Sequence, residues 1–163
     1  MLGRCRYEPS HRVSIKRVWT AAEERRTPLN TDPLGGMHVA LYYLALAFLI
    51  THELDAVAHS EWRLLFVLRN LEDAAAAQTF VALHVPLLFA VLWHSHHARR
   101  EIGYWTRGGV AVFLVVHTLV HFALSGAPQY DFDGVLSRIL ILSSGAFGGL
   151  YLISQWRSRE ANG

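Results

Sequence analysis

Four apolar segments alternate with short polar segments along most of the chain. They cover residues 37–51, 77–93, 108–125 and 139–155. Each is close to the length of about 20 residues that a helix needs to cross about 30 Å of hydrocarbon. The first segment reaches this length if its helix continues through Glu53 and Asp55. Because the segments lack the polar stripe of a soluble bundle, they predict an all-α, integral membrane four-helix bundle.

The segment between the first two spans has a different pattern. In residues 59–71 the apolar side chains of Trp62, Leu65, Phe66 and Leu68 recur at helical spacing, and arginines occupy other positions. This pattern is typical of a helix that lies in the membrane interface. The sequence therefore predicts an extra outer interfacial amphipathic helix.

The domain organisation follows from the same pattern. Residues 1–36 are polar, rich in Arg, and contain several Pro and Gly residues, so we expect a flexible basic N-terminal tail. Met37 begins the first apolar segment directly, and a mis-assigned start that should fall at Met37 remains an alternative. Residues 37–156 form the predicted four-span domain, and residues 157–163 form a short cytoplasmic tail.

Composition and charge support a membrane protein and orient it. Hydrophobic residues make up 52% of the chain and charged residues 17%, whereas soluble proteins carry about 25% charged residues. Twelve of the 15 Lys and Arg residues fall in the N-terminal segment, the second loop and the C-terminal tail, and three fall in the other two loops. An excess of Lys and Arg marks the cytoplasmic side. We therefore expect a protein of the cell (inner) membrane with both termini in the cytoplasm.

The candidate chemistry lies in the histidines, since the single Cys5 excludes a disulfide scaffold and a thiolate-rich metal site. With this topology, residues from three spans meet in the outer half of the bilayer. His117 and His121 are four residues apart and share one helical face. Imidazole suits both Zn and Fe. The predicted metal ligands are His52, Asp55, His84, His117 and His121.

Two glutamates complete the predicted site as catalytic proton carriers, Glu53 and Glu61. Glu53 follows His52 and points about 100° away from it on a helix, so it would be a base behind the ligands or a separate ligand. The stretch His52 to Ala56 begins like the H-E-x-x-H motif of zinc proteases but has Ala at its last position, so no such protease is predicted.

Three of these histidines also have a simpler interpretation. His84 precedes Pro86 and would donate a hydrogen bond to a carbonyl that this proline leaves free. His117 and His121 would hold helices together by hydrogen bonds. Polar groups inside a membrane are nevertheless functional by default, which favours a site for the whole set. At the other membrane face, "HSHH" (94–97) is a basic flank or an adventitious metal binder.

The stretch from His52 to Arg63, "HELDAVAHSEWR", carries a resemblance to a known group of proteins. With a His in the second span and an H-x-x-x-H in the third, the chain from about Met37 to Gln155 resembles small uncharacterised bacterial four-span membrane proteins. These carry an H-E-L-D-A…E-W-R signature and form a domain of unknown function. The resemblance implies a fold, a location and signature positions, but no reaction. Those positions are His52, Glu53, Asp55, Glu61, Trp62 and Arg63.

Three functions fit these observations. The first is a metal-dependent membrane enzyme that holds Zn or Fe and acts on a small or lipophilic substrate. The second is a haem-binding electron-transfer protein, with His84 and either His117 or His121 as axial ligands. The third is a non-catalytic transporter or accessory subunit, in which the same residues form a proton relay. The expected partner is the lipid bilayer and not nucleic acid, and an oligomer remains open.

Overall fold

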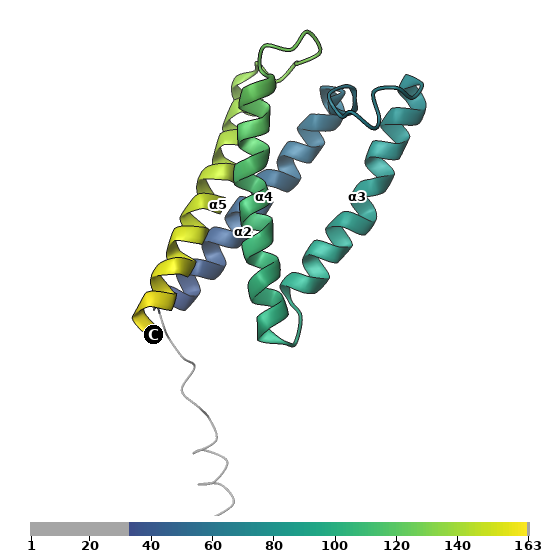
Figure 1. Cartoon of the computed structure of the whole chain (residues 1–163). Helices are drawn as coiled ribbons and strands as arrows, with labels where there is room; N and C mark the ends of the chain where they lie inside the picture. The colour runs from purple at the N-terminus through teal and green to yellow at the C-terminus, as the bar shows by residue number, and fades with distance from the viewer. Residues whose placement is uncertain (1–32, 163) are drawn as a thin grey trace, which may run out of the picture. The chain divides into compact units, whose positions relative to one another are not determined.

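The computed structural model describes residues 33–162, and this part is all-helical, without strands. Four long helices follow one another along the chain (Figure 1). Their bounds are α2 (Pro33–Ala58), α3 (Asp73–Ser95), α4 (Arg100–Leu124) and α5 (Val135–Asn162), with a short 3₁₀ helix η1 (Glu61–Arg63) after α2. The predicted tail lies outside the described residues, apart from residues 33–36, which begin α2.

All four long helices could cross a membrane by length and composition. The candidate spans are Gly36–Ala58, Asp73–Ser95, Arg100–Leu124 and Val135–Glu160. Helix α2 continues through Glu53 and Asp55, which gives it the length that a membrane span needs. Each helix also leaves large apolar side chains exposed on the outside of the bundle, among them Leu44, Leu83, Val116 and Leu142. Such surfaces on every helix suit contact with lipid rather than water.

Two apolar clusters hold the helices together. One joins α2, α4 and α5 through Tyr42, Leu46, Leu49, Leu114 and Tyr151 with two buried alanines. The second joins the loop after α2 to α3 and to the start of α5. It contains Ala56, Trp62, Leu68, Ala76, Phe80, Phe132 and Ile141. The second cluster fixes the end of the bundle at which α2 ends and α3 begins.

Helices α4 and α5 pack side by side at close range (Figure 1). Glycines on α5 make this approach feasible. A Cβ at Gly145 would lie 2.9 Å from the Cβ of Thr118 and closer still to its hydroxyl. A Cβ at Gly148 would lie 3.1 Å from the carbonyl oxygen of Ala111. Small residues at these two positions therefore let the backbones come together, as in other membrane helix pairs.

The prediction of an interfacial helix over residues 59–71 is wrong. The structure has only the three residues of η1 and a series of turns there. Ser60 takes a left-handed conformation, with φ 57° and ψ 44°, and this ends the helical path after α2. Trp62 and Leu68 are buried in the second apolar cluster, whereas Phe66 is 73% exposed. Packing against α3, rather than helical periodicity, decides how this loop folds.

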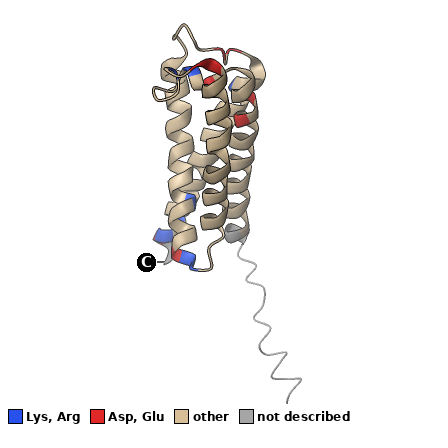
Figure 2. Cartoon of the chain, turned by 90° about the vertical axis from the view of Figure 1, so that its right-hand side faces the viewer, with Lys and Arg blue, Asp and Glu red and all other residues tan. Residues whose placement is uncertain are grey.

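The charges separate between the two ends of the described bundle (Figure 2). Most Asp and Glu residues lie at the end with the α2–α3 and α4–α5 loops, where Glu61 and Asp73 are found. Most arginines lie at the other end, with the α3–α4 loop and the C-terminal part of α5, where Arg100 and Arg159 are found. We call these the acidic end and the basic end.

Candidate metal centre

A group of buried polar side chains lies at the acidic end of the bundle. His52 comes from the last two turns of α2, and His117 and His121 come from the last two turns of α4. Glu61 is the first residue of η1. The left-handed turn at Ser60 directs the chain back over the end of α2, which places Glu61 next to these histidines.

The four side chains converge on one point. The Nε2 atom of His52 lies 3.4 Å from a carboxylate oxygen of Glu61. The Nε2 atoms of His117 and His121 lie 3.7 Å and 3.5 Å from the other oxygen. One ligand atom from each residue can be chosen so that all four lie within 4.8 Å of one another. This group, His52, Glu61, His117 and His121, could hold a metal ion, and we call it the His/Glu cluster.

Several atoms of the cluster have no hydrogen-bond partner among the described residues. Both ring nitrogens of His52, one oxygen of Glu61 and the Nδ1 atoms of His117 and His121 are buried without one. The side chain of His52 is fully buried. Most buried polar atoms in proteins make hydrogen bonds, because desolvation without a partner is costly. A bound cation would satisfy the carboxylate and one nitrogen of each imidazole.

The electrostatics of the cluster favour a cation. Burial raises the pKa of Glu61, but its contacts with the imidazoles of His117, His121 and His52 outweigh burial. The net effect holds the pKa of Glu61 well below its usual range, so the carboxylate is ionised. Three imidazoles around one carboxylate are therefore a donor set that fits Zn²⁺ or Fe²⁺.

Aromatic side chains surround the cluster. Phe132 is fully buried, and its ring lies 5.5 Å from that of His52 and 5.0 Å from that of His121. Tyr130 contacts the ring of His121, and Phe113 stacks on the ring of His117. An apolar shell of this kind limits water access and strengthens the electrostatic interactions inside it.

Neighbouring contacts keep η1 in position. The indole nitrogen of Trp62 donates a hydrogen bond of 3.0 Å to Asp73 at the start of α3. The guanidinium of Arg63 donates two hydrogen bonds of 3.0 Å to the same carboxylate. Because Trp62 and Arg63 directly follow Glu61, their attachment to α3 holds the Glu61 carboxylate over the histidines.

The other predicted ligands have different partners. His84 pairs with Glu53, with 2.8 Å between Nε2 and a carboxylate oxygen, and its Nδ1 donates to the carbonyl of Phe80. Asp55 contacts His59, at 3.3 Å from Nδ1. The structure therefore brings together His52, His117 and His121 of the predicted ligands, and not Asp55 or His84.

The structure places Glu61 within the His/Glu cluster. Sequence reasoning made it a proton carrier, but it lies among the candidate ligands themselves. Helical spacing pointed to Asp55 instead, because Asp55 shares a face of α2 with His52. The signal for Glu61 was its place beside Trp62 and Arg63 in the E-W-R part of the signature.

Comparison with protein families matches residues 38–158 to a family of unknown function, DUF6713. The chain belongs to this family. The match covers α3, α4 and most of α2 and α5, and it includes every residue of the His/Glu cluster. Searches of curated proteins and of solved structures gave no match. Membership in DUF6713 confirms the expected domain of unknown function, and it assigns no reaction.

Proposed function

We propose that this DUF6713 protein is a multi-pass membrane enzyme that depends on a metal ion bound at the His/Glu cluster. The supporting observation is the convergence of three imidazoles and one ionised carboxylate, from α2, η1 and α4, within 4.8 Å. A tetrahedral site with bonds of about 2.1 Å has edges of about 3.4 Å. The Glu61 carboxylate lies at similar distances from the three imidazoles, 3.4 Å from His52 through one oxygen and 3.5 and 3.7 Å from His121 and His117 through the other. Zn and Fe are the metals proposed.

A metal ion held by these four residues would need a fifth, open position to bind a water, and as a Lewis acid it would then lower the pKa of that water. Because Glu61 serves as a ligand in our proposal, a different residue must carry the proton. Glu53 is that carrier, with His84 at 2.8 Å as its partner.

A pocket of about 320 Å³ next to the cluster suits a small or lipophilic substrate. It lies between α4 and α5 and has His121 in its wall. Thr118, Phe122, Ile141 and Leu142 supply its largely apolar lining, and Tyr130, Asp133 and Arg138 lie at the loop end. A substrate in this pocket would have its apolar part between the helices and its polar part near His121.

The proposed location is the inner membrane, with both termini in the cytoplasm. The supporting observation is the separation of charge between the two ends of the bundle, with arginines gathered at the basic end (Figure 2). In this orientation the His/Glu cluster lies toward the outer side of the membrane.

A proton relay without catalysis is the second candidate. The Glu53–His84 contact favours it, because such pairs conduct protons inside membrane proteins. Haem has less support. Both ring nitrogens of His84, one of the two axial ligands that haem would need, already have partners within the protein.

Metal analysis of the purified full-length protein tests the proposal. The protein should be prepared without a polyhistidine tag, and its Zn and Fe content measured by elemental analysis. We expect close to one metal ion per chain. Substitution with Co²⁺ should then give the intense visible absorption of a tetrahedral or five-coordinate site. Protein without stoichiometric metal that also fails to bind added Zn²⁺, Fe²⁺ or Co²⁺ would leave the proton relay as the better function.

A further inference from the structure

A second pocket lies at the basic end of the bundle, far along α4 from the His/Glu cluster. It is open, has a volume of about 710 Å³, and is formed where α3 leads into α4 and where α5 ends. Three arginines line it, Arg100 and Arg107 from α4 and Arg159 from α5. Glu101 is the one carboxylate among the lining residues, so the arginines leave the pocket with a net positive charge.

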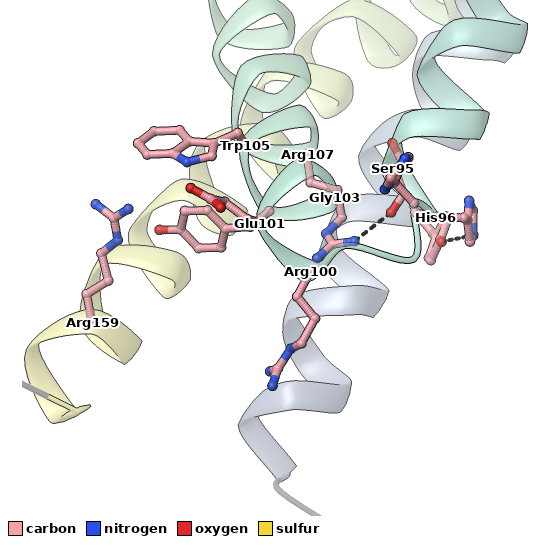
Figure 3. A pocket seen from close by; sticks show the side chains of 11 residues that line it. Ser95, His96, Arg100, Glu101, Gly103, Trp105, Arg107 and Arg159 are labelled. Carbon is pink, nitrogen blue, oxygen red and sulfur yellow. Dashed lines mark hydrogen bonds between the residues drawn. The ribbon is translucent and has the colours of Figure 1, made fainter.

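The structure holds two of these arginines in defined positions (Figure 3). Arg107 points toward Ser95 and donates a hydrogen bond of 2.7 Å to its carbonyl. Arg159 approaches from α5, with its guanidinium 4.9 Å from the ring centre of Tyr104 and 5.4 Å from that of Trp105. A guanidinium carries five N–H donors in its plane. Both contacts therefore leave donors for an anion.

Exposed tryptophans indicate the depth of this pocket in the membrane. Trp93, Trp105 and Trp156 lie near this end of α3, α4 and α5, and each is about three-fifths exposed, at 60–61%. Tryptophan is enriched at the level of the lipid headgroups. Since Trp105 also lines the pocket, a membrane position set by these tryptophans would put the arginines at the depth of lipid phosphates.

An apolar pocket adjoins the basic one. It has a volume of about 560 Å³, is lined by Phe89, Leu92 and Trp93 of α3, and shares His96 and His97 with the basic pocket. His96 is held in place between the two pockets by hydrogen bonds with the Tyr43 hydroxyl and the Leu92 carbonyl. The molecule thus presents a cationic site beside an apolar site, which matches a phosphate headgroup with an attached acyl chain.

We propose that the basic pocket binds the phosphate group of an anionic lipid. Arginine forms paired, charge-assisted hydrogen bonds with phosphate, and basic pockets between membrane helices commonly hold such headgroups. A soluble phosphate ester offers the same headgroup chemistry. The neighbouring apolar pocket and the tryptophans favour the lipid as the source. This site is independent of the proposed metal centre, which lies at the other end of the bundle.

Native mass spectrometry of the full-length protein tests this assignment. Protein is released from detergent micelles that contain phosphatidylglycerol or, in parallel, phosphatidylcholine. We expect the amount of bound phosphatidylglycerol to exceed that of phosphatidylcholine by at least about tenfold. Of the two lipids, only phosphatidylglycerol carries a net negative charge. Equal retention of the two lipids would overturn the proposal. A third sample holds the protein in phosphatidylcholine micelles with added glycerol phosphate, and binding of glycerol phosphate as strong as that of phosphatidylglycerol would overturn the lipid as the source.

Matched double variants locate the site. Arg100→Gln with Arg159→Gln removes two charges that line the pocket, and Arg99→Gln with Arg157→Gln removes two charges from the same end that do not line it. Both pairs change the net charge equally. We expect the first pair to lose at least about tenfold in phosphatidylglycerol binding and the second to stay within about twofold. Equal losses in the two pairs would show that the lipid is attracted by the overall positive charge of this end, and would overturn the assignment of the pocket as the binding site. Circular dichroism of each variant verifies that it is folded.

Discussion

Glu61 lies 3.4 Å from His52 although η1 and α2 are separate elements. The left-handed backbone at Ser60 brings them together, because it turns the chain back at the end of α2. The Trp62 and Arg63 contacts with Asp73 then hold the turn against α3. This relationship places a carboxylate among three imidazoles and underlies the proposed metal centre.

Replacing His121 by Ala should sharply lower the metal content of the protein. His121 lies in the cluster, 3.5 Å from Glu61, and its loss removes one of four ligands. Even the loss of an outer partner of a metal site costs about 10–100-fold in affinity. Elemental analysis of metal per chain measures the effect.

His96→Ala is the control for that variant, because His96 lies at the basic end and pairs with Tyr43. Its metal content should equal that of the unchanged protein. An unaltered metal content in His121→Ala would contradict the assignment of His121 as a ligand.

Glu61→Gln and Glu53→Gln should have different effects. Glu61 contacts all three histidines of the cluster, so Glu61→Gln should weaken metal binding by at least about tenfold. Glu53 pairs instead with His84, so Glu53→Gln should keep the metal. Titration with Co²⁺, followed by visible absorption, compares the two affinities. If Glu53→Gln loses the metal as fully as Glu61→Gln, the assignment of separate roles fails.

Gly145→Ala should destabilise the helix pair α4–α5, because the new Cβ would overlap Thr118. Overpacking of this kind costs about 1–3 kcal/mol. Gly149→Ala makes the same substitution one turn later, where the nearest atom is 3.9 Å away and no loss is expected. Thermal unfolding in detergent, followed by circular dichroism, should give a lower Tm for Gly145→Ala only. Equal midpoints for both variants would argue against the close approach of α4 and α5.

The orientation of the chain in the membrane can be measured directly. A reporter fused after Gln155 should be active on the cytoplasmic side, and one inserted near Tyr130 on the outer side, because arginines gather at the basic end. Paired reporters that work on opposite sides of the membrane check both positions. The reverse labelling would place the His/Glu cluster on the cytoplasmic side.

Local patterns in the sequence were enough for the helices and for part of the site. Apolar runs of membrane-spanning length predict α2 to α5, since in lipid the backbone must satisfy its hydrogen bonds within each segment. A spacing of four residues puts His117 and His121 on one face. The order of the spans places them at the same end as His52. Glu53, next to His52 but turned away from it, pairs with a different residue, as helical geometry requires.

Tertiary packing decided the rest. Spacing along α2 favoured Asp55 beside His52, but the carboxylate that joins the histidines is Glu61, which a left-handed turn delivers. Residues 59–71 have helical periodicity, yet Trp62 and Leu68 turn inward against α3 and no helix forms. Periodicity describes only which residues share a face of one segment. How helices rotate against one another, and where a loop returns, depends on burying side chains from several segments at once, which no local pattern contains.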